Sequence, residues 1–328
     1  MARAGNKMER VLAALAGEKV SPVPFSVWCH LGTQHLPGQR AAGIQLDFFR
    51  FYDLDWLKVM NDYRYPLPEG VDAVRSVDDL RRFRPLGTEA PHVREQLALL
   101  AALRAELEGD AFFIDTVFSP FGTVLRCVKG ATYRLMREYP EEFLRVLQVV
   151  TADLKDYVAA ALRSGAAGIF FSVNGAVAPS APGGSAAPGE PSCLSREEFL
   201  RFVRPFDLQV LEVAMAAGRF NVVHVHGAPL AFDWVADYPG HAFNWSTHHT
   251  PPSLAEGRGR TGGRCVIGGI DEVQTPRYTV PEIREQVRQA IGETGGVGMM
   301  VGPGCAIPVE TPPDLILAAR QAAREWRG

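Results

Sequence analysis

The sequence predicts an α/β fold, a single (β/α)₈ TIM barrel with an N-terminal helical extension. Eight short apolar or β-branched segments alternate with amphipathic helices, which is typical of a parallel sheet. Eight such units in 328 residues favour a closed barrel over the structural alternative, a doubly wound open sheet. No internal repeat or domain boundary interrupts this order, so residues 1–328 are expected to form one domain.

The individual elements follow from periodicity and capping residues. Helix 8–16 places Val11, Leu12 and Leu15 on one face and ends at Gly17. Ser195 and Glu198 form a capping box that starts another helix. The predicted helices are 8–16, 93–107, 140–161, 196–216, 280–291 and 313–326. The predicted strands are 23–28, 56–60, 111–115, 168–172, 220–225, 242–245, 265–269 and 297–301.

Composition excludes several classes of function. A formal charge of −3 with scattered arginines offers no basic field for nucleic acid. No apolar run approaches the ~20 residues that span a bilayer, and the polar N-terminus lacks a signal-peptide core. Five irregularly spaced cysteines without a CxxC pair fit a reducing compartment, so we expect a cytoplasmic protein with a small-molecule substrate.

One segment departs from the strand–helix rhythm. Residues 176–192 consist almost entirely of Ala, Pro, Gly and Ser, and they follow the fourth predicted strand. The segment is either a surface linker or, because it follows a strand at its carboxyl end, an active-site lid.

Polar residues gather after the predicted strands. In a (β/α)₈ barrel, the carboxyl ends of the strands converge on one mouth, where catalysis occurs. We predict catalytic roles for Asp62, Ser172, Asn174 and His248. We predict substrate-binding roles for His30, Gln34, Asn61, Asp115, Asn244 and Asp271.

Simpler interpretations of several of these residues stay open. Asp62 also suits a turn, and His248 also suits a solvated loop. Asp115 also suits an ion pair with an arginine such as Arg126. Ser172 has no evident His–Asp partner and is better suited to donating a hydrogen bond than to nucleophilic attack.

The sharpest motif is His224-Val225-His226. Residues i and i+2 of a strand face the same side, so both imidazoles can approach one ion. Cys305 follows Gly302-Pro303-Gly304, where small residues let the backbone bend a thiol toward the mouth. Two imidazoles and one thiolate suit Zn²⁺ with an open fourth position. A hydrogen-bonded histidine pair is the alternative.

Motifs over nearly the full length resemble the uroporphyrinogen decarboxylase superfamily. They are Glu9-Arg10-Val11-Leu12-Ala13-Ala14-Leu15-Ala16-Gly17-Glu18, Leu36-Pro37, Val59-Met60-Asn61-Asp62, Ser119-Pro120-Phe121-Gly122, Gly268-Gly269-Ile270-Asp271 and Gly302-Pro303-Gly304-Cys305. The resemblance implies a (β/α)₈ barrel and is compatible with a homodimer.

The resemblance also separates two chemistries. True uroporphyrinogen decarboxylases use no metal and hold a polycarboxylate with arginines, but His30 and Gln34 stand at the two arginine positions. Arg126 stands where the family has tyrosine, and we expect it to bind substrate. Imidazole and amide are poor replacements for bidentate guanidinium.

The second branch comprises zinc-dependent methyltransferases that pass a methyl group from a corrinoid protein to a thiol such as coenzyme M. His224 and Cys305 match two of the family's zinc ligands, and His226 stands where cysteine is expected. The resemblance therefore implies Zn²⁺ held by these three residues, with a corrinoid on a partner protein or a small molecule as methyl donor. Two alternatives stay open: tetrapyrrole decarboxylation using Arg64 and Arg126, and a non-catalytic barrel that binds a corrinoid or porphyrin.

Overall fold

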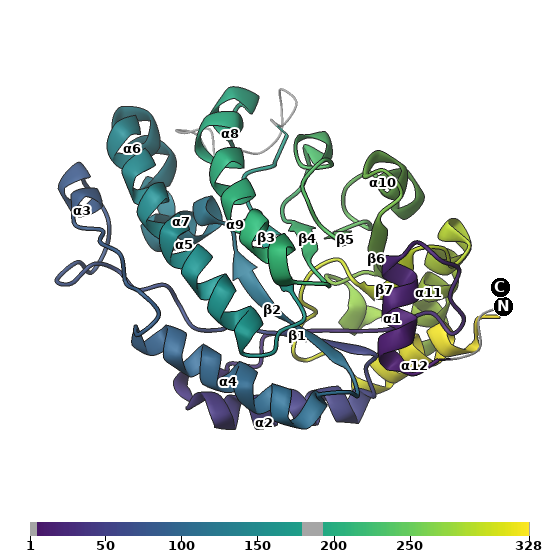
Figure 1. Cartoon of the computed structure of the whole chain (residues 1–328). Helices are drawn as coiled ribbons and strands as arrows, with labels where there is room; N and C mark the ends of the chain where they lie inside the picture. The colour runs from purple at the N-terminus through teal and green to yellow at the C-terminus, as the bar shows by residue number, and fades with distance from the viewer. Residues whose placement is uncertain (1–4, 179–192, 328) are drawn as a thin grey trace.

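A curled, parallel sheet forms the centre of the molecule in the computed structural model, which describes residues 5–178 and 193–327 (Figure 1). Strands adjacent in the sequence are also neighbours in the sheet, in the order β1 to β7. Each neighbouring pair is parallel. The strands are β1 (Trp56–Val59), β2 (Phe112–Phe118), β3 (Ile169–Val173), β4 (Val222–Val225), β5 (Ala242–Trp245), β6 (Cys265–Ile270) and β7 (Met299–Pro303).

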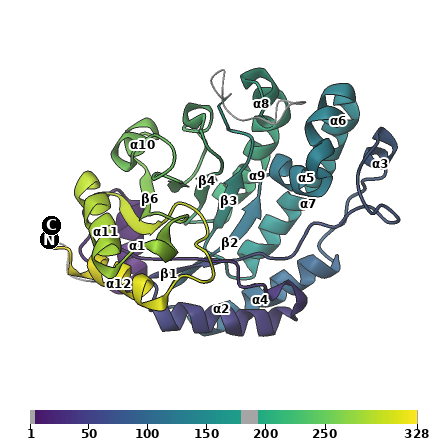
Figure 2. The ribbon, with the colours of Figure 1, turned by 180° about the vertical axis from the view of Figure 1, so that it is seen from behind.

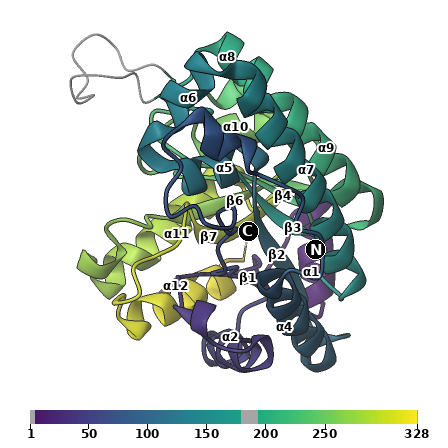
Figure 3. The ribbon, with the colours of Figure 1, turned by 90° about the vertical axis from the view of Figure 1, so that its left-hand side faces the viewer.

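Helices surround the outer side of the sheet (Figures 1 and 2). The pair α2 and α4 lies side by side at one end, as Figure 3 also shows. The helices are α1 (Lys7–Leu15), α2 (Gly38–Tyr52), α3 (Val77–Arg81), α4 (Pro91–Leu107), α5 (Pro120–Val128), α6 (Thr132–Glu138), α7 (Pro140–Arg163), α8 (Arg196–Phe202), α9 (Arg204–Ala217), α10 (Leu254–Arg260), α11 (Val280–Thr294) and α12 (Pro313–Glu325). None of these helices combines the length and hydropathy needed to cross a bilayer.

The eighth predicted strand is present only as an extended segment. Residues 23–28 lie between β7 and β1, where Phe25 forms a single parallel bridge with Val301. Ser26 N–H donates to Val301 O at 3.0 Å, and Asp55 N–H donates to Phe25 O at 2.9 Å. Pro22 and Pro24 have no N–H to donate, which limits the ladder on this segment. The described residues thus form a TIM-like curled sheet of seven strands, one fewer than predicted.

Two hydrophobic clusters follow from the alternation of side chains along each strand. The outer cluster fills the space between sheet and helices, and the smaller inner cluster fills the curl. On β2, Phe112 and Ile114 belong to the inner cluster, whereas Phe113 and Val117 belong to the outer one. Each even-numbered position on β2 therefore faces the interior of the curl.

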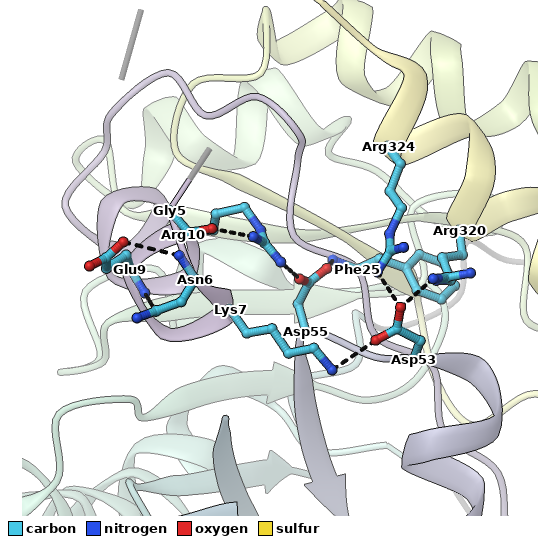
Figure 4. A network of polar contacts seen from close by, with 10 residues as sticks. All are labelled: Gly5, Asn6, Lys7, Glu9, Arg10, Phe25, Asp53, Asp55, Arg320 and Arg324. Carbon is cyan, nitrogen blue, oxygen red and sulfur yellow. Dashed lines mark hydrogen bonds and ion pairs between the residues drawn. The ribbon is translucent and has the colours of Figure 1, made fainter. Parts of the chain in front are cut away.

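An ionic network joins α1, the start of β1 and α12 at the amino-terminal end of the sheet (Figure 4). Asp55 accepts a hydrogen bond from Phe25 N–H at 2.9 Å and pairs with Arg10. Asp53 pairs with Lys7 at 2.9 Å and with Arg320 and Arg324 of α12. In barrels of this type, residues at this end contribute to stability, whereas the opposite end carries the chemistry.

Two of the predicted elements, a helix and a strand, have clearly different boundaries in the structure. The predicted helix 196–216 is two helices, α8 and α9, because Pro205 begins a new first turn. Strand β2 continues to Phe118, three residues beyond the predicted end at Asp115. The capping box of Ser195 and Glu198 is confirmed, with Glu198 N–H donating to Ser195 Oγ at 3.1 Å. Most of the predicted linker or lid, residues 179–192, lies outside the described residues.

Candidate active site

A polar layer crosses the inner face near the carboxyl ends of three adjacent strands. Ser172 of β3 lies in register with His224 of β4, which lies in register with Asn244 of β5. Position i−2 of each strand, namely Phe170, Val222 and Ala242, belongs to the inner cluster, so these polar side chains face inward as well. The period of two places a histidine inside the curl, as the sequence predicts.

His224, His226 and Cys305 come together at this end of the sheet. One ligand atom from each residue lies within 4.8 Å of the other two. Cys305 Sγ lies 3.9 Å from His226 Nδ1, and the two imidazole centroids are 5.9 Å apart. Zinc bonds of ~2.0–2.3 Å set tetrahedral ligand atoms about 3.5 Å apart, so small side-chain adjustments would close the site.

Asn244 selects the tautomer of His224. The amide nitrogen of Asn244 donates to Ile267 O at 2.9 Å and to Pro303 O at 3.0 Å. Its oxygen therefore faces His224 Nδ1, at 2.6 Å, and can only accept a hydrogen bond. A neutral His224 then carries its proton on Nδ1 and leaves the Nε2 lone pair free to bind a metal.

The ionisation of the other two residues also suits metal ligation. Burial raises the pKa of the Cys305 thiol, but interactions with His224, with the Ala306 N–H and with Lys58 outweigh burial and lower it overall. Burial lowers the pKa of His226, and Arg126 adds to this effect while Glu272 opposes it. A thiolate and neutral imidazoles are the forms that bind Zn²⁺.

The three residues line a small hollow of about 150 Å³. Five further residues predicted from the sequence also line it: His30, Asn61, Arg126, Ser172 and Asn174. The remaining walls come from residues that the sequence analysis did not select: Trp28, Lys58, Met60, Thr116, Phe118, Phe170 and Ala306. Among them, Lys58 had a recognisable signal, because it is a single charge inside the apolar run Trp56-Leu57-Lys58-Val59-Met60.

A larger cavity of about 680 Å³ adjoins the hollow. The two spaces share Asn61, Thr116, Phe118 and Arg126. Three tyrosines, Tyr63, Tyr65 and Tyr157, contribute to a wall rich in apolar and aromatic side chains. This volume is in the usual range for organic ligands. Its lining comes from the loop after β1, from residues 86–88, from the end of β2 and from α4, α5 and α7. No single motif predicted the cavity, because these segments are far apart in the sequence.

Two predicted residues act next to the hollow instead of lining it. Asn244 is fully buried and holds His224 as described above. Asp62 bonds His30 Nδ1 at 2.9 Å and accepts a long hydrogen bond from Thr33 N–H at 3.4 Å. Both residues therefore orient a histidine side chain.

Asp115 lies on the outer face of β2 and lines neither cavity, although its partners Gln96 and Tyr157 line the larger one. Its carboxylate accepts hydrogen bonds from Gln96 of α4, at 2.8 Å, and from Tyr157 of α7. It forms no ion pair with Arg126, whose guanidinium instead stacks 4.1 Å from the Phe118 ring centroid. Strand β2 extends past Asp115, so this residue is not at a strand end and points into the helix layer.

Three further residues lie outside the hollow and the cavity. Gln34 is exposed and contacts His35. His248 is exposed on the loop after β5. Asp271 accepts hydrogen bonds from His249, from Tyr278 and from two backbone N–H groups, which leaves it fully engaged.

The fold is of the TIM-like α/β type, and the candidate site gathers polar residues at the carboxyl ends of its parallel strands. Residues 60–326 match the family model described as uroporphyrinogen decarboxylase (URO-D). The chain belongs to the uroporphyrinogen decarboxylase family, as its motifs indicate. A search of curated protein sequences finds no match.

Solved structures share the fold at low sequence identity. A methyltransferase from Methanosarcina mazei is similar with a TM-score of 0.72 and 18% identity, over 98% of each chain. A B12-independent methionine synthase from Shewanella sp. W3-18-1, in complex with selenomethionine, has a TM-score of 0.56 and 13% identity over 92% of each chain. A putative vitamin-B12 independent methionine synthase from Listeria monocytogenes has a TM-score of 0.56 and 11% identity, over 89% of this chain and 87% of that one.

Proposed function

We propose that this protein is a zinc-dependent methyltransferase. The observation that carries the proposal is the convergence of His224, His226 and Cys305, with Asn244 leaving Nε2 of His224 free. The chemistry of this donor set fits Zn²⁺, because a thiolate and two neutral imidazoles leave one position open. Structural similarity to a methyltransferase and to B12-independent methionine synthases supports the reaction class.

The protein residues have separate tasks in this reaction. Bound Zn²⁺ would supply a Lewis acid that keeps an incoming thiol deprotonated at neutral pH. Asn244 holds the ring of His224 in place, and the ring of Phe170 packs against that of His224 at a centroid distance of 5.0 Å. The adjoining cavity would hold the methyl donor in line with the thiolate. Holding the two reactants in this orientation would raise the reaction rate.

The set of two histidines and one cysteine bears on the choice of substrates. Replacing a thiolate ligand by neutral imidazole makes the site one charge more positive. The bound thiol is then more acidic but less nucleophilic, so the acceptor differs from the usual thiol or the donor is a small ether or amine. A corrinoid carried by a partner protein is the other donor that we propose.

Tetrapyrrole decarboxylation is the second candidate. It is favoured by Arg64 and Arg126, which line the large cavity and form no ion pair with a described residue. Guanidinium groups recognise carboxylates well. Incubation with uroporphyrinogen and detection of a four-carboxylate product would identify this activity.

Metal analysis of the purified chain tests the zinc proposal. We expect about one zinc per native chain, and its loss from the His224→Ala and Cys305→Ser variants. Cys127→Ser is the matched control, because Cys127 is a partly buried thiol away from the three ligands. Full methyl transfer by a metal-free protein, or zinc retained by both ligand variants, would falsify the proposal.

A further inference from the structure

Lys58 is a buried cation on the inner face of β1. It is 4% exposed and lies between Trp56 and Met60, which both belong to the inner cluster. Its ammonium lies 4.6 Å from the Phe170 ring centroid and 5.6 Å from that of Trp28. The one hydrogen-bond acceptor within reach among the described residues is Met60 Sδ, at 3.0 Å, and a thioether is a weak acceptor.

The carboxylates near Lys58 are engaged elsewhere. Asp62 is bonded to His30 and Thr33, and Asp115 is bonded to Gln96 and Tyr157 on the far side of β2. Neither forms an ion pair with Lys58, although both are near enough to affect its ionisation. Cys305 is the leading negative charge that acts on Lys58, but no hydrogen bond joins the two among the described residues. Buried charges in proteins are normally paired by hydrogen bonds, so the N–H groups of Lys58 are available to an anion that enters from outside.

The side chain keeps its charge near neutral pH. Burial lowers the pKa of Lys58 to about 8, while the negative charges of Cys305, Asp115 and Asp62 oppose that effect. The ammonium lines the same hollow as Cys305. An anion bound to Lys58 would therefore lie beside the thiol.

We propose that the hollow binds the anionic end of a small substrate, a carboxylate or a sulfonate, on the ammonium of Lys58. This names the substrate class of the same site and rests on the proposed function for its role in turnover. The volume of about 150 Å³ limits the bound group to a few heavy atoms. The body of a longer substrate would continue past Asn61 and Arg126 into the adjoining cavity.

Alkylation of the metal-free chain tests this assignment without zinc or methyl transfer. Iodoacetate and iodoacetamide are similar in size and differ in charge. In both reactions the Cys305 thiolate attacks the methylene carbon, the S–C bond forms as the C–I bond breaks, and iodide leaves. Site-resolved mass spectrometry gives the two rates at Cys305 and at Cys193, a partly buried thiol outside the hollow.

We expect Lys58→Met to lower the iodoacetate-to-iodoacetamide rate ratio at Cys305 by about tenfold, because one buried charge partner is lost. The ratio cancels any change in the thiolate fraction of Cys305, since both reagents need the thiolate. The ratio at Cys193 should stay constant. An unchanged ratio at Cys305 in a folded Lys58→Met variant overturns the proposal.

Protection of the native chain gives a second measurement that needs no variant. Acetate and methanesulfonate should each slow the reaction of Cys305 with iodoacetamide in a saturable way, and the more effective anion identifies the headgroup. Absence of protection by both anions also overturns the proposal. The alkylation and protection measurements use metal-free protein, so their outcome is independent of zinc binding. The anion site can therefore be excluded while the native chain still binds one zinc, and zinc binding can be excluded while the anion site is supported.

Discussion

The oxygen of the Asn244 side chain lies 2.6 Å from Nδ1 of His224, and both nitrogen-bound hydrogens of the same amide are used by backbone carbonyls. The amide therefore cannot turn over without losing two hydrogen bonds. This contact determines which nitrogen of His224 is free.

Asn244→Ala should weaken zinc binding by about 10- to 100-fold, the usual effect of losing a partner that orients a histidine ligand. The ring of His224 would then be able to rotate and to change tautomer. Competition with a chelator of known affinity measures the change. Gln209→Ala, which removes an exposed amide of α9, is the control and should leave affinity unchanged. Equal affinity in both variants would show that Asn244 does not orient His224.

Gly304→Ala should also lower zinc affinity, through the backbone next to Cys305. A Cβ at this position would meet Ser246 Cα at 2.6 Å and Trp245 O at 2.9 Å, and backbone atoms cannot move away easily. We expect a stability loss of about 1–3 kcal/mol, as for other overpacked sites, together with displacement of the thiol. Gly292→Ala is the matched control, since nothing lies within 4 Å of a Cβ there. Native zinc content in Gly304→Ala would contradict this account.

Tyr157→Phe should destabilise the fold more at pH 8 than at pH 5. Burial raises the pKa of Asp115 to about 6, and the hydrogen bond from Tyr157 opposes that rise. At pH 8 the carboxylate is charged and loses a donor, which costs about 1–3 kcal/mol. At pH 5 the carboxyl group is mostly protonated, so removing the Tyr157 hydroxyl lowers the free energy of unfolding by a smaller amount. Urea unfolding at the two pH values gives the difference, and an equal loss at both would exclude a charged Asp115 as its cause.

Asp53→Asn should remove stability that the native protein has at neutral pH and lacks in acid. Burial raises the pKa of Asp53, but hydrogen bonds from Lys7 and Arg324 outweigh it and lower the pKa from 3.8 to about 2. A lowered folded-state pKa stabilises above about pH 4, and this stabilisation disappears as the pH falls through about 2.

Because Asp53 is 40% exposed, we expect the loss at pH 7 to be about 1 kcal/mol or less. Asparagine tolerates the left-handed backbone at this position, where φ is 46°, so the variant isolates the charge. Thermal unfolding of the native chain and the variant at pH 7 and pH 2 measures the loss of stability. Asp110→Asn is the control, because Asp110 is an exposed carboxyl without an ion pair among the described residues. A deficit as large at pH 2 as at pH 7 would point to a cause other than charge.

Periodicity predicted the parts of the site that lie on strands. The i, i+2 spacing of His224 and His226 holds in three dimensions, and Cys305 reaches them from the loop after β7. The strand-end rule was wrong for Asp115, because apolar residues continue beyond it and β2 extends to Phe118. Successive strand residues face opposite sides, so the true last residue, Phe118, faces the hollow, whereas Asp115 faces the helices.

The large cavity could not be predicted because its walls are distant in sequence. Asn61 and Tyr157 are joined by a hydrogen bond of 3.3 Å across 96 positions, and nothing in either local pattern indicates the contact. Lys58, in contrast, could have been recognised from the sequence. A charged residue within an apolar strand is normally either paired with an opposite charge or part of a functional site. Its position between two apolar residues that face inward is the signal that local reasoning could have used.

The extended segment 23–28 gives the molecule one wall with fewer backbone restraints than the others. It makes a single bridge to β7, whereas β6 and β7 share five register pairs. Trp28 lies at the end of this segment and forms one side of the hollow. Displacement of that indole would widen the hollow while the ladders from β1 to β7 stay intact.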